Sequence, residues 1–245
     1  MLVATDGQQR AIEAEQADRA GVYHCPECSA PVCLRRGRLV IAHFAHVVRP
    51  LSCTLAGETA THLWMKHNMR LFFGIANTRV EQALIPGHRA DVVVVAQRLV
   101  IECQVSPIAL GEWEQRTHDY NRQGYAVLWV WWPTRLGISP DKQDLNDYDA
   151  IALGQRGVRV KPEVLACHKL AYGRVYVLAR TGQLVAVHME PVRRVGIGGA
   201  EHRLKRTRYL QLWPLTPTPL LARTTFHQET KTRLAQIEPE VAWWH

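Results

Sequence analysis

A pair of carboxylates stands where two strand-like segments could bring it together. Glu102 and Gln104 lie two residues apart in Leu99–Val105, so they share one face of an extended strand. Asp91 begins the preceding strand-like segment, and a hairpin between the segments would place its carboxylate near that of Glu102. Converging carboxylates bind hard cations such as Mg²⁺ or Mn²⁺, which can activate a water for attack on a phosphodiester. The pattern therefore indicates metal-dependent hydrolysis of a nucleic acid.

The two carboxylates also fit a purely structural interpretation. Asp91 could cap the start of its strand, and Glu102 could pair with Arg89 or Arg116. Charged residues are common at strand ends, so the spacing alone leaves this alternative open.

A second group of metal-capable residues crowds into the first 53 residues. Cys25-x₂-Cys28 is a zinc-type pair, and His43-x₂-His46 followed by Cys53 supplies three more donors. Structural Zn²⁺ takes four such ligands, and clustered cysteines favour metal over disulfides when the first 20 residues do not read as a secretory signal. We expect the ligands to be Cys25, Cys28, His46 and Cys53, with His43 as the alternative fourth ligand.

Two helices and four strands are expected to hold the carboxylates. Glu58–Phe73 has a helical period, with one face for burial (Ala60, Leu63, Trp64, His67, Leu71) and another that carries Glu58, His62 and Lys66. A second helix over Pro107–Gln123 would begin after Ser106 as N-cap and end at Gly124. Strand-like runs at 78–84, 90–96, 99–105 and 125–132 complete an α-β-β-β-α-β order.

The flanking regions offer fewer signals. Residues 1–20 could form at most one short surface helix, and residues 134–160 read as a loop-rich linker. Residues 173–179 and 184–188 alternate around Thr181-Gly182, which predicts a hairpin. A closing helix is expected over Phe226–Ile237.

Residues from about 22 to 132 resemble the competence protein CoiA family through an ordered set of motifs. The set comprises the Cys-Pro-x-Cys and His-Phe-Ala-His elements, Gly57-Glu58 with His62 and Lys66, Val80-Glu81, Arg89-Ala90-Asp91-Val92, Ile101-Glu102-Cys103-Gln104-Val105-Ser106, Arg116, Tyr120 and Leu128-Trp129. That family is assigned to the PD-(D/E)XK, restriction-endonuclease-like fold. The resemblance therefore implies an α/β protein with an αβββαβ nuclease core beside the zinc module.

The resemblance also implies roles at the catalytic centre. Asp91 and Glu102 would bind the catalytic cation, with the backbone carbonyl of Cys103 as a further ligand. Gln104 stands where the fold's common pattern has a lysine. Glutamine can position a water but brings no positive charge, so this departure puts full activity in doubt.

Residues on the two helices would assist this centre. Glu58 is a candidate extra ligand, and Lys66 could supply the displaced cation or remain a solvated helix lysine. His62 could bind phosphate or shuttle protons. Arg116 could contact the scissile phosphate as a bidentate donor, and Tyr120 shares its helix face.

The formal charge of +8 is concentrated in the C-terminal part of the chain. Residues 151–245 hold 15 Lys and Arg against 6 Asp and Glu, whereas residues 1–150 hold 15 against 16. A basic segment of this kind indicates a polyanionic partner. The strongest run contains four residues that could follow a phosphate backbone: Arg203, Lys205, Arg206 and Arg208. Trp113, Trp213 and Trp243-Trp244 are expected to be freer than the other tryptophans and could stack on single-stranded bases.

These observations divide the chain into four expected parts. Residues 1–21 would decorate the protein, 22–56 form a zinc-finger-like module, 57–133 form the nuclease core, and 134–245 hold a linker, a hairpin and a basic extension. No apolar stretch approaches the roughly 20 residues of a membrane-spanning helix, so we expect a cytoplasmic protein without membrane contact.

The expected function is that of a Mg²⁺- or Mn²⁺-dependent deoxyribonuclease with structural Zn²⁺. It would act in DNA processing or recombination during competence or a related pathway, on DNA that includes single strands. A homo-oligomer or a recombination-protein partner would fit that setting. Two alternatives stay open: an inactive nucleic-acid-binding protein on a nuclease scaffold, and a zinc-stabilised factor that binds a protein partner.

Overall fold

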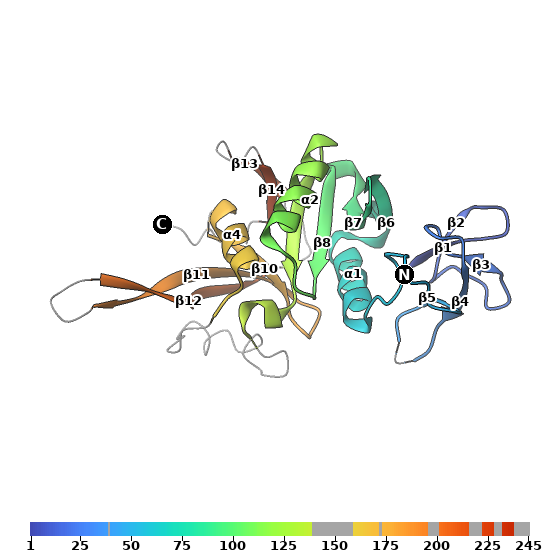
Figure 1. The fold of residues 1–245 in the computed structure, drawn as a ribbon, viewed down its shortest axis with the longest axis horizontal. Coiled ribbons are helices and arrows are strands. Elements are labelled where there is room, and N and C mark those ends of the chain that lie inside the picture. The colour runs from blue at the N-terminus through green and yellow to red at the C-terminus, as the bar shows by residue number, and fades with distance from the viewer. Residues whose placement is uncertain are drawn as a thin grey trace.

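Two β-sheets organise the chain in the computed structural model (Figure 1). The structure describes residues 1–38, 40–138, 159–171, 173–195, 201–215, 222–227 and 232–237. The smaller sheet has five strands in the order β2-β1-β3-β4-β5. Their bounds are Val3–Thr5 (β1), Ala11–Glu13 (β2), Tyr23–His24 (β3), Pro31–Arg35 (β4) and His43–His46 (β5).

The first 20 residues form strands and not the expected short helix. β1 pairs with β2 in antiparallel register, with Val3 opposite Glu13, and β1 also pairs with β3. Leu2 and Ala4 are buried, so this segment contributes apolar side chains to the protein interior. The polar composition of the region concealed these few buried positions.

The larger sheet has nine strands, and its main path runs β12-β11-β10-β9-β8-β7-β6. β8, β9 and β10 run parallel, whereas β6, β7 and β8 run antiparallel. The bounds are Thr78–Ile85 (β6), His88–Val94 (β7), Leu99–Gln104 (β8), Ala126–Trp131 (β9), Val175–Leu178 (β10), Leu184–Val195 (β11), Glu201–Pro214 (β12), Ala222–His227 (β13) and Thr232–Ile237 (β14).

The helices among the described residues are α1 (Ala60–Phe73), α2 (Leu110–Arg122) and α4 (Pro162–Leu170). The described residues also include short 3₁₀ turns at Ile75–Asn77, Val95–Gln97 and Pro133–Leu136. The predicted element order is confirmed, because α1, β6, β7, β8, α2 and β9 follow one another along the chain. The predicted N-cap is wrong. α2 begins after Ala109, and no side chain caps it.

The two long helices pack against opposite faces of the central strands. On one face, Met65 and Met69 of α1 join the cluster that contains Ile101 and Cys103 of β8. On the other face, Trp113 of α2 joins the cluster that contains Val100, Val127, Trp129 and Trp131. Trp113 is fully buried, so the expectation that it is free to stack on bases is wrong.

The buried face of α1 is rotated from the one that the apolar period predicted. Leu71 is 52% exposed, whereas Lys66 and Arg70 are only 2% and 3% exposed. The two cations are buried because each is paired with carboxylates. Arg70 Nη2 lies 2.7 Å from Glu13 Oε2, and Lys66 pairs with the carboxylate cluster described below. Ion pairing, and not hydrophobicity alone, therefore sets the orientation of this helix.

The C-terminal part contains one confirmed and one incorrect prediction. β10 and β11 form the predicted hairpin, with Leu178 opposite Leu184. The segment Phe226–Ile237 is not a helix, because β13 and β14 form an antiparallel hairpin there. β14 also pairs with β9 at Val127, where Leu234 is buried against the sheet. That long-range pairing leaves no trace in the local sequence pattern.

Several predicted segments fall outside the part of the chain that the structure describes. Most of the predicted linker lies there, as does Trp243-Trp244. The side chain of Trp213, on β12, is likewise outside the description. None of the described helices combines the length and the apolar character that a membrane span requires.

Candidate functional site

A cleft of about 230 Å³ opens where the start of α1 meets the middle of β7 and the C-terminal end of β8. Its lining residues come from four segments of the chain and include most of the predicted catalytic residues: Gly57, Glu58, Thr59, His62, Asp91, Glu102, Cys103, Gln104, Val105, Ser106 and Arg116. Lys66 does not belong to this lining.

Asp91 is held from two sides. The backbone N–H of Cys103 donates to Asp91 Oδ2 at 2.8 Å, which ties the carboxylate of β7 to the neighbouring strand β8. His62 Nε2 lies 3.0 Å from the same oxygen. Burial would raise the pKa of Asp91, but the charge and hydrogen bond of His62 outweigh burial and lower the pKa. Asp91 is therefore an ionised and rigidly placed carboxylate.

Glu102 is almost completely buried and turns toward α2, where Oε2 accepts a hydrogen bond from the Arg116 guanidinium. That guanidinium also lies over the Trp129 ring, with 5.5 Å from Cζ to the ring centre. The other oxygen, Oε1, is buried and makes no hydrogen bond of standard geometry with a described residue. Burial raises the pKa of Glu102 to about 7, although the nearby Arg116 charge and Tyr120 hydroxyl act to lower it. Glu102 thus has one ion pair, with Arg116, and one buried oxygen near the Tyr120 hydroxyl.

Only part of the purely structural interpretation of Asp91 and Glu102 agrees with the structure. Glu102 does pair with Arg116, as that interpretation proposed. Asp91, however, is hydrogen-bonded to Cys103 of β8 and to His62 of α1, so it does more than cap the start of its strand. The pair with Arg116 engages only Oε2 of Glu102, and Oε1 makes no hydrogen bond of standard geometry with a described residue.

The start of α1 adds a third carboxylate, that of Glu58, and an imidazole, that of His62. His62 Nδ1 lies 2.8 Å from Glu58 Oε1, so the imidazole bridges Glu58 and Asp91. Burial would lower the pKa of His62, but the Asp91 carboxylate and the two hydrogen bonds raise it to about 10. His62 is therefore an imidazolium with both ring N–H groups donated to carboxylates.

Lys66 lies beneath the cleft, one helical turn from His62. Its ammonium pairs with Glu58, lies 2.8 Å from Glu81 Oε1, and lies 3.7 Å from Asp91 Oδ1. Burial would lower the pKa of Lys66, but these three carboxylates hold it well above its usual range. Lys66 is accordingly a buried counter-ion that neutralises the site carboxylates from below, and not a solvated helix lysine.

Glu81 completes this buried cluster, although the sequence reasoning gave it no site role. It has a left-handed backbone, with φ of 53°, next to an irregularity in the pairing of β6 with β7. Its carboxylate accepts the backbone N–H groups of Leu2 and Val3 at 2.7 and 3.0 Å. The Val80-Glu81 motif was the available signal, because it belongs to the family resemblance.

Gln104 lines the cleft, and its amide is fixed. Its Nε2 donates to the carbonyl of Ser106 at 2.7 Å. The amide therefore has a defined orientation, and its oxygen remains an acceptor. Cys103 lines the cleft through its backbone, while its side chain packs in the core on the α1 face.

The donors of the cleft fit a divalent cation. Ligand atoms of Glu58, His62 and Asp91 all lie within 4.8 Å of one another. Glu102 adds the buried oxygen that makes no hydrogen bond of standard geometry with a described residue. Four carboxylates, those of Glu58, Glu81, Asp91 and Glu102, face three side-chain cations and the Met1 ammonium, which lies 3.0 Å from Glu58 Oε2, so the charges of this region balance before a divalent cation binds. Carboxylate oxygens favour Mg²⁺ and Mn²⁺. His62 is not a ligand in this arrangement, because both of its ring nitrogens carry protons.

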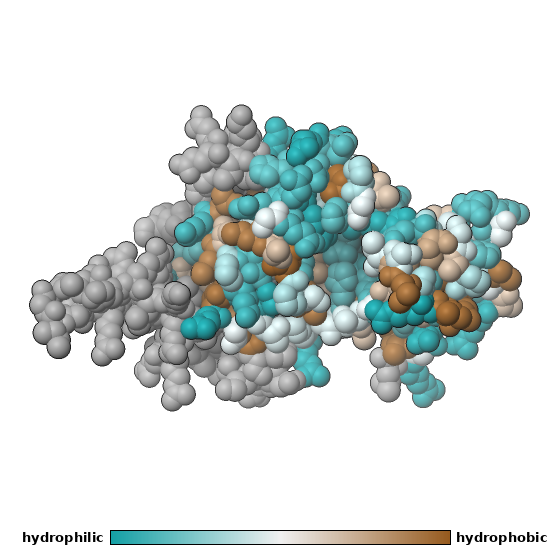
Figure 2. Space-filling model, in the orientation of Figure 1, coloured by the Kyte–Doolittle hydropathy of each residue, from teal (hydrophilic) through white to brown (hydrophobic). Residues whose placement is uncertain are grey.

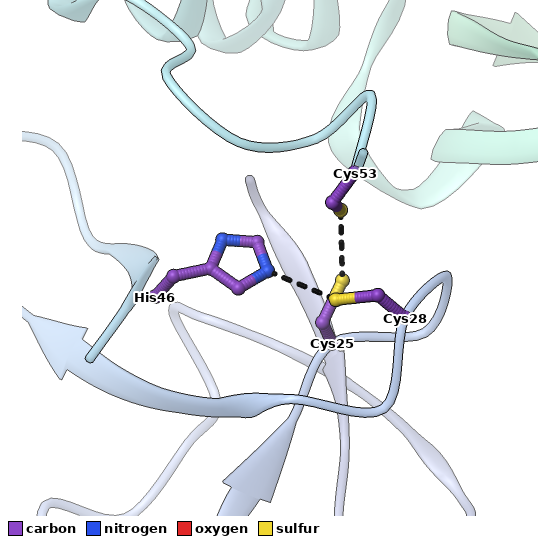
Figure 3. Close-up of side chains that lie close together, drawn as sticks. All are labelled: Cys25, Cys28, His46 and Cys53. Atoms are coloured by element: carbon purple, nitrogen blue, oxygen red, sulfur yellow. Dashed lines mark hydrogen bonds between the residues drawn. The ribbon is translucent and has the colours of Figure 1, made fainter. Parts of the chain in front are cut away.

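The second metal-capable group lies in the N-terminal sheet (Figure 3). Cys25 and Cys28 come from the loop between β3 and β4, His46 ends β5, and Cys53 comes from the loop before α1. Cys25 Sγ lies 3.6 Å from Cys53 Sγ, and Cys28 Sγ lies 3.3 Å from His46 Nε2. His43 is turned away, with its Nδ1 only 2.7 Å from the carbonyl of Ile41.

This cluster fits Zn²⁺. A tetrahedral site with Zn–S bonds of about 2.3 Å separates its sulfur ligands by about 3.8 Å, close to the separation of Cys25 and Cys53. Burial raises the pKa of the Cys53 thiol to about 12, so a thiolate there requires a nearby cation. Cys33 is exposed and lies outside the cluster.

The cluster is joined to the cleft through short contacts. Glu27, between the two loop cysteines, accepts the backbone N–H of Thr54 at 2.6 Å. Arg89 Nη2 donates to the carbonyl of Pro26 at 3.3 Å, and Arg89 stands two residues before Asp91 on β7. The metal-capable loop and β7, the strand that carries Asp91, thus share a contact.

The predicted basic run lies elsewhere. Arg203, Lys205, Arg206 and Arg208 belong to β12, which forms a long hairpin with β11. This hairpin projects from the core on the side opposite the N-terminal sheet (Figure 1). None of the four belongs to the lining of the cleft as the structure describes it.

Comparison with protein families gives two matches in tandem. Residues 6–56 match the family model described as competence protein CoiA, N-terminal domain. Residues 58–169 match the family model described as competence protein CoiA, nuclease-like domain. Comparisons with curated proteins and with solved structures gave no match.

Proposed function

The chain belongs to the competence protein CoiA family, and from its nuclease-like domain we propose that it is a metal-dependent nuclease that hydrolyses phosphodiester bonds in DNA. We further propose that residues 57–133 are a catalytic unit of the PD-(D/E)XK type. The order α1-β6-β7-β8-α2-β9, with Asp91 and Glu102 on neighbouring strands, supports that assignment. DNA processing in competence is the biological setting that the family description supports.

One observation carries the proposal: Glu102 Oε1 is buried in the same site as the ionised Asp91 and makes no hydrogen bond of standard geometry with a described residue. A buried carboxylate oxygen without a partner costs stability, on the order of 1–3 kcal/mol. Such a cost is expected where a ligand supplies the missing contact. A divalent cation held by Asp91, Glu102 and the Cys103 carbonyl, with Glu58 nearby, would supply it.

The residues of the cleft have complementary roles in hydrolysis. The bound cation would activate a water and stabilise the charge that develops on the phosphate. Gln104, with its amide fixed by Ser106, can orient that water through Oε1. His62 holds a proton on Nε2 that can pass to the leaving oxygen.

Lys66 and Arg116 act as positioning residues. Lys66 compensates the charge of Glu58 and Asp91 from below the cleft. Arg116 holds Glu102 through Oε2, so Oε1 is the oxygen that a cation would use. In the N-terminal sheet, we propose that Cys25, Cys28, His46 and Cys53 hold a structural Zn²⁺.

The experiment is a cleavage assay on circular, linear and single-stranded DNA and on RNA, with Mn²⁺, Mg²⁺ or EDTA. Wild type is compared with Glu102→Gln, and with Glu112→Gln as a matched control, because Glu112 is an exposed glutamate on α2. We expect cleavage to require the cation and to fall about 10³-fold in Glu102→Gln only. Equal cleavage by the two variants would refute the assigned role of Glu102.

A second candidate function is nucleic-acid binding without hydrolysis. It is favoured by one observation: Gln104 brings no charge, and Lys66 is fully engaged by three carboxylates. The cleavage assay separates the two functions, because a wild-type protein that binds DNA but cleaves no substrate in Mn²⁺ or Mg²⁺ would establish the second candidate.

A further inference from the structure

The loop that follows β5 presents a cation at the edge of the cleft. Arg49 is exposed, and it makes no hydrogen bond or ion pair with any residue that the structure describes. Its guanidinium packs against Gly57, in the space that a Cβ atom at that position would occupy. Gly57 belongs to the lining of the cleft, so Arg49 lies at the rim of the cleft although it comes from the N-terminal sheet.

Gly57 is suited to this contact in two ways. Its φ of +86° is a conformation that other residues rarely adopt, and it has no side chain to displace the guanidinium. A glycine directly before Glu58 therefore lets a cation from one region of the molecule approach the cleft of the other.

Other cations near the cleft are already engaged by protein acceptors. Lys66 and His62 pair with the site carboxylates, and Arg116 pairs with Glu102. Arg89 donates to the backbone carbonyls of Glu81 and Pro26. Within the described residues, Arg49 is therefore the cation at this rim that a phosphate can reach without breaking an existing ion pair.

The neighbours of Arg49 are apolar and exposed. Val47, Val48 and Leu51 are 65%, 79% and 106% exposed. Figure 2 shows that apolar side chains gather on the visible face of the N-terminal sheet region. Exposed apolar side chains beside an arginine suit a nucleic acid whose bases are unpaired, because unpaired bases offer apolar faces that a duplex hides.

We propose that residues 47–51, the rim loop, bind a single-stranded nucleic-acid segment that leads to the cleft. Arg49 contacts a phosphate next to the scissile one, and Val48 and Leu51 contact unpaired bases. This inference rests on the proposed function, since it assumes that the cleft holds a phosphodiester, and it assigns to the N-terminal module a direct part in substrate binding.

The test measures binding by fluorescence anisotropy, with the full-length, zinc-loaded chain in Ca²⁺. The probes are a labelled 20-nucleotide single strand and its duplex, and the label is checked for cleavage after each titration. The variants are Arg49→Gln, Arg49→Lys and Val48→Ser with Leu51→Ser. Arg38→Gln is the matched control: Arg38 is exposed in the turn between β4 and β5, at the opposite end of that hairpin from the rim loop.

We expect Arg49→Gln to weaken single-strand binding about fivefold and to reduce the salt slope by about 0.7, which is the contribution of one phosphate contact. Arg49→Lys should retain the slope, and Arg38→Gln should match wild type. The apolar double variant should weaken single-strand binding about fivefold with little effect on the duplex. Zinc content and circular dichroism show whether each variant is folded.

Two results would overturn the inference. One is an Arg49→Gln variant that binds the single strand as Arg38→Gln does. The other is an apolar double variant that loses affinity for the two probes equally. The proposed function fails separately: a wild-type protein with loop-dependent binding but no metal-dependent cleavage would leave the rim loop established and refute the nuclease assignment.

Discussion

The two metal-capable groups of this protein differ in how their donors are held. The cysteine cluster brings together four donors from two loops and one strand. The Sγ atoms of Cys25 and Cys53 lie 3.6 Å apart, and Cys28 Sγ lies 3.3 Å from His46 Nε2. The cleft gathers oxygen donors that are held by other side chains: Asp91 by His62, and Glu102 by Arg116. The first group has the composition of a closed site, and the second keeps an open side toward solvent.

This difference indicates how the protein divides stability from chemistry. Four donors that complete a tetrahedron around Zn²⁺ would leave no ligand position for a substrate, so a metal in the proposed site would contribute to folding and not to chemistry. The cleft instead accumulates buried charge, which costs stability unless counter-ions are present. Breaking each group should therefore have distinct consequences.

The largest effect is expected from loss of a cysteine ligand. Cys53→Ser should abolish stoichiometric zinc binding and expose residues 1–56 to proteolysis, because structural zinc contributes about 10–16 kcal/mol of apparent binding free energy. Zinc analysis and limited proteolysis measure these outcomes. Cys33→Ser, in an exposed cysteine outside the cluster, should behave as wild type. Equal zinc content in the two variants would show that the cluster is not the zinc site.

Loss of the buried lysine should be the next largest effect. Lys66→Met leaves Glu58, Glu81 and Asp91 without their shared counter-ion, so the free energy of unfolding should fall by about 3–5 kcal/mol in urea denaturation. Lys169→Met makes the same chemical change at an exposed position of α4 and should shift stability by less than about 0.5 kcal/mol. Similar losses in the two variants would contradict a special role for Lys66.

Cation binding in the cleft should depend on pH. Burial raises the pKa of Glu102 to about 7, so protons compete with the cation below that pH. The affinity for Mn²⁺ should fall by about tenfold for each pH unit below about 6, and it should level off above about pH 8. Calorimetric titration of the zinc-loaded chain measures this dependence. A flat profile between pH 5.5 and 8 would show that Glu102 does not bind the cation.

A half-buried histidine of α4, which belongs to neither group, should give the smallest effect. Burial, with the nearby His188 in addition, lowers the pKa of His168 to about 4, and its Nε2 accepts the Met189 N–H at 3.0 Å. Because the folded pKa lies below the unfolded value of about 6.5, His168 contributes stability above pH 6.5 that is lost as the pH falls toward 4.

His168→Gln keeps an acceptor without this titration. The free energy of unfolding of the variant should therefore depend on pH less than that of wild type between pH 6.5 and 4, by about 1–2 kcal/mol. Urea denaturation at several pH values measures the difference. An unchanged pH dependence would show that another group governs acid stability.

The sequence predicted the elements that position the cleft because their signals are local. Apolar periods and turn residues located α1, β6, β7, β8, α2 and β9 within a few residues. The zinc-type donors were recognisable from spacing, and the structure brings Cys25, Cys28, His46 and Cys53 together. Both kinds of signal reside in short segments.

Features that depend on distant contacts were not predictable in this way. The helix expected at 226–237 is a hairpin because β14 pairs with β9, which lies about a hundred residues earlier in the sequence. The buried state of Lys66 depends on carboxylates from three separate segments, and a lysine at a helical period reads as solvated. The position of the Arg49 guanidinium against Gly57 is a contact between two loop residues, which no helical or strand period predicts.

The most direct test of two sites with separate tasks is a calorimetric titration of Mn²⁺ into the zinc-loaded chain, for wild type and for Asp91→Asn, with zinc measured in the same samples. The account predicts a Mn²⁺ site in wild type that Asp91→Asn loses, while zinc content stays the same in both. If Asp91→Asn binds Mn²⁺ as wild type does, the cleft is not the catalytic cation site, and the central claim is wrong.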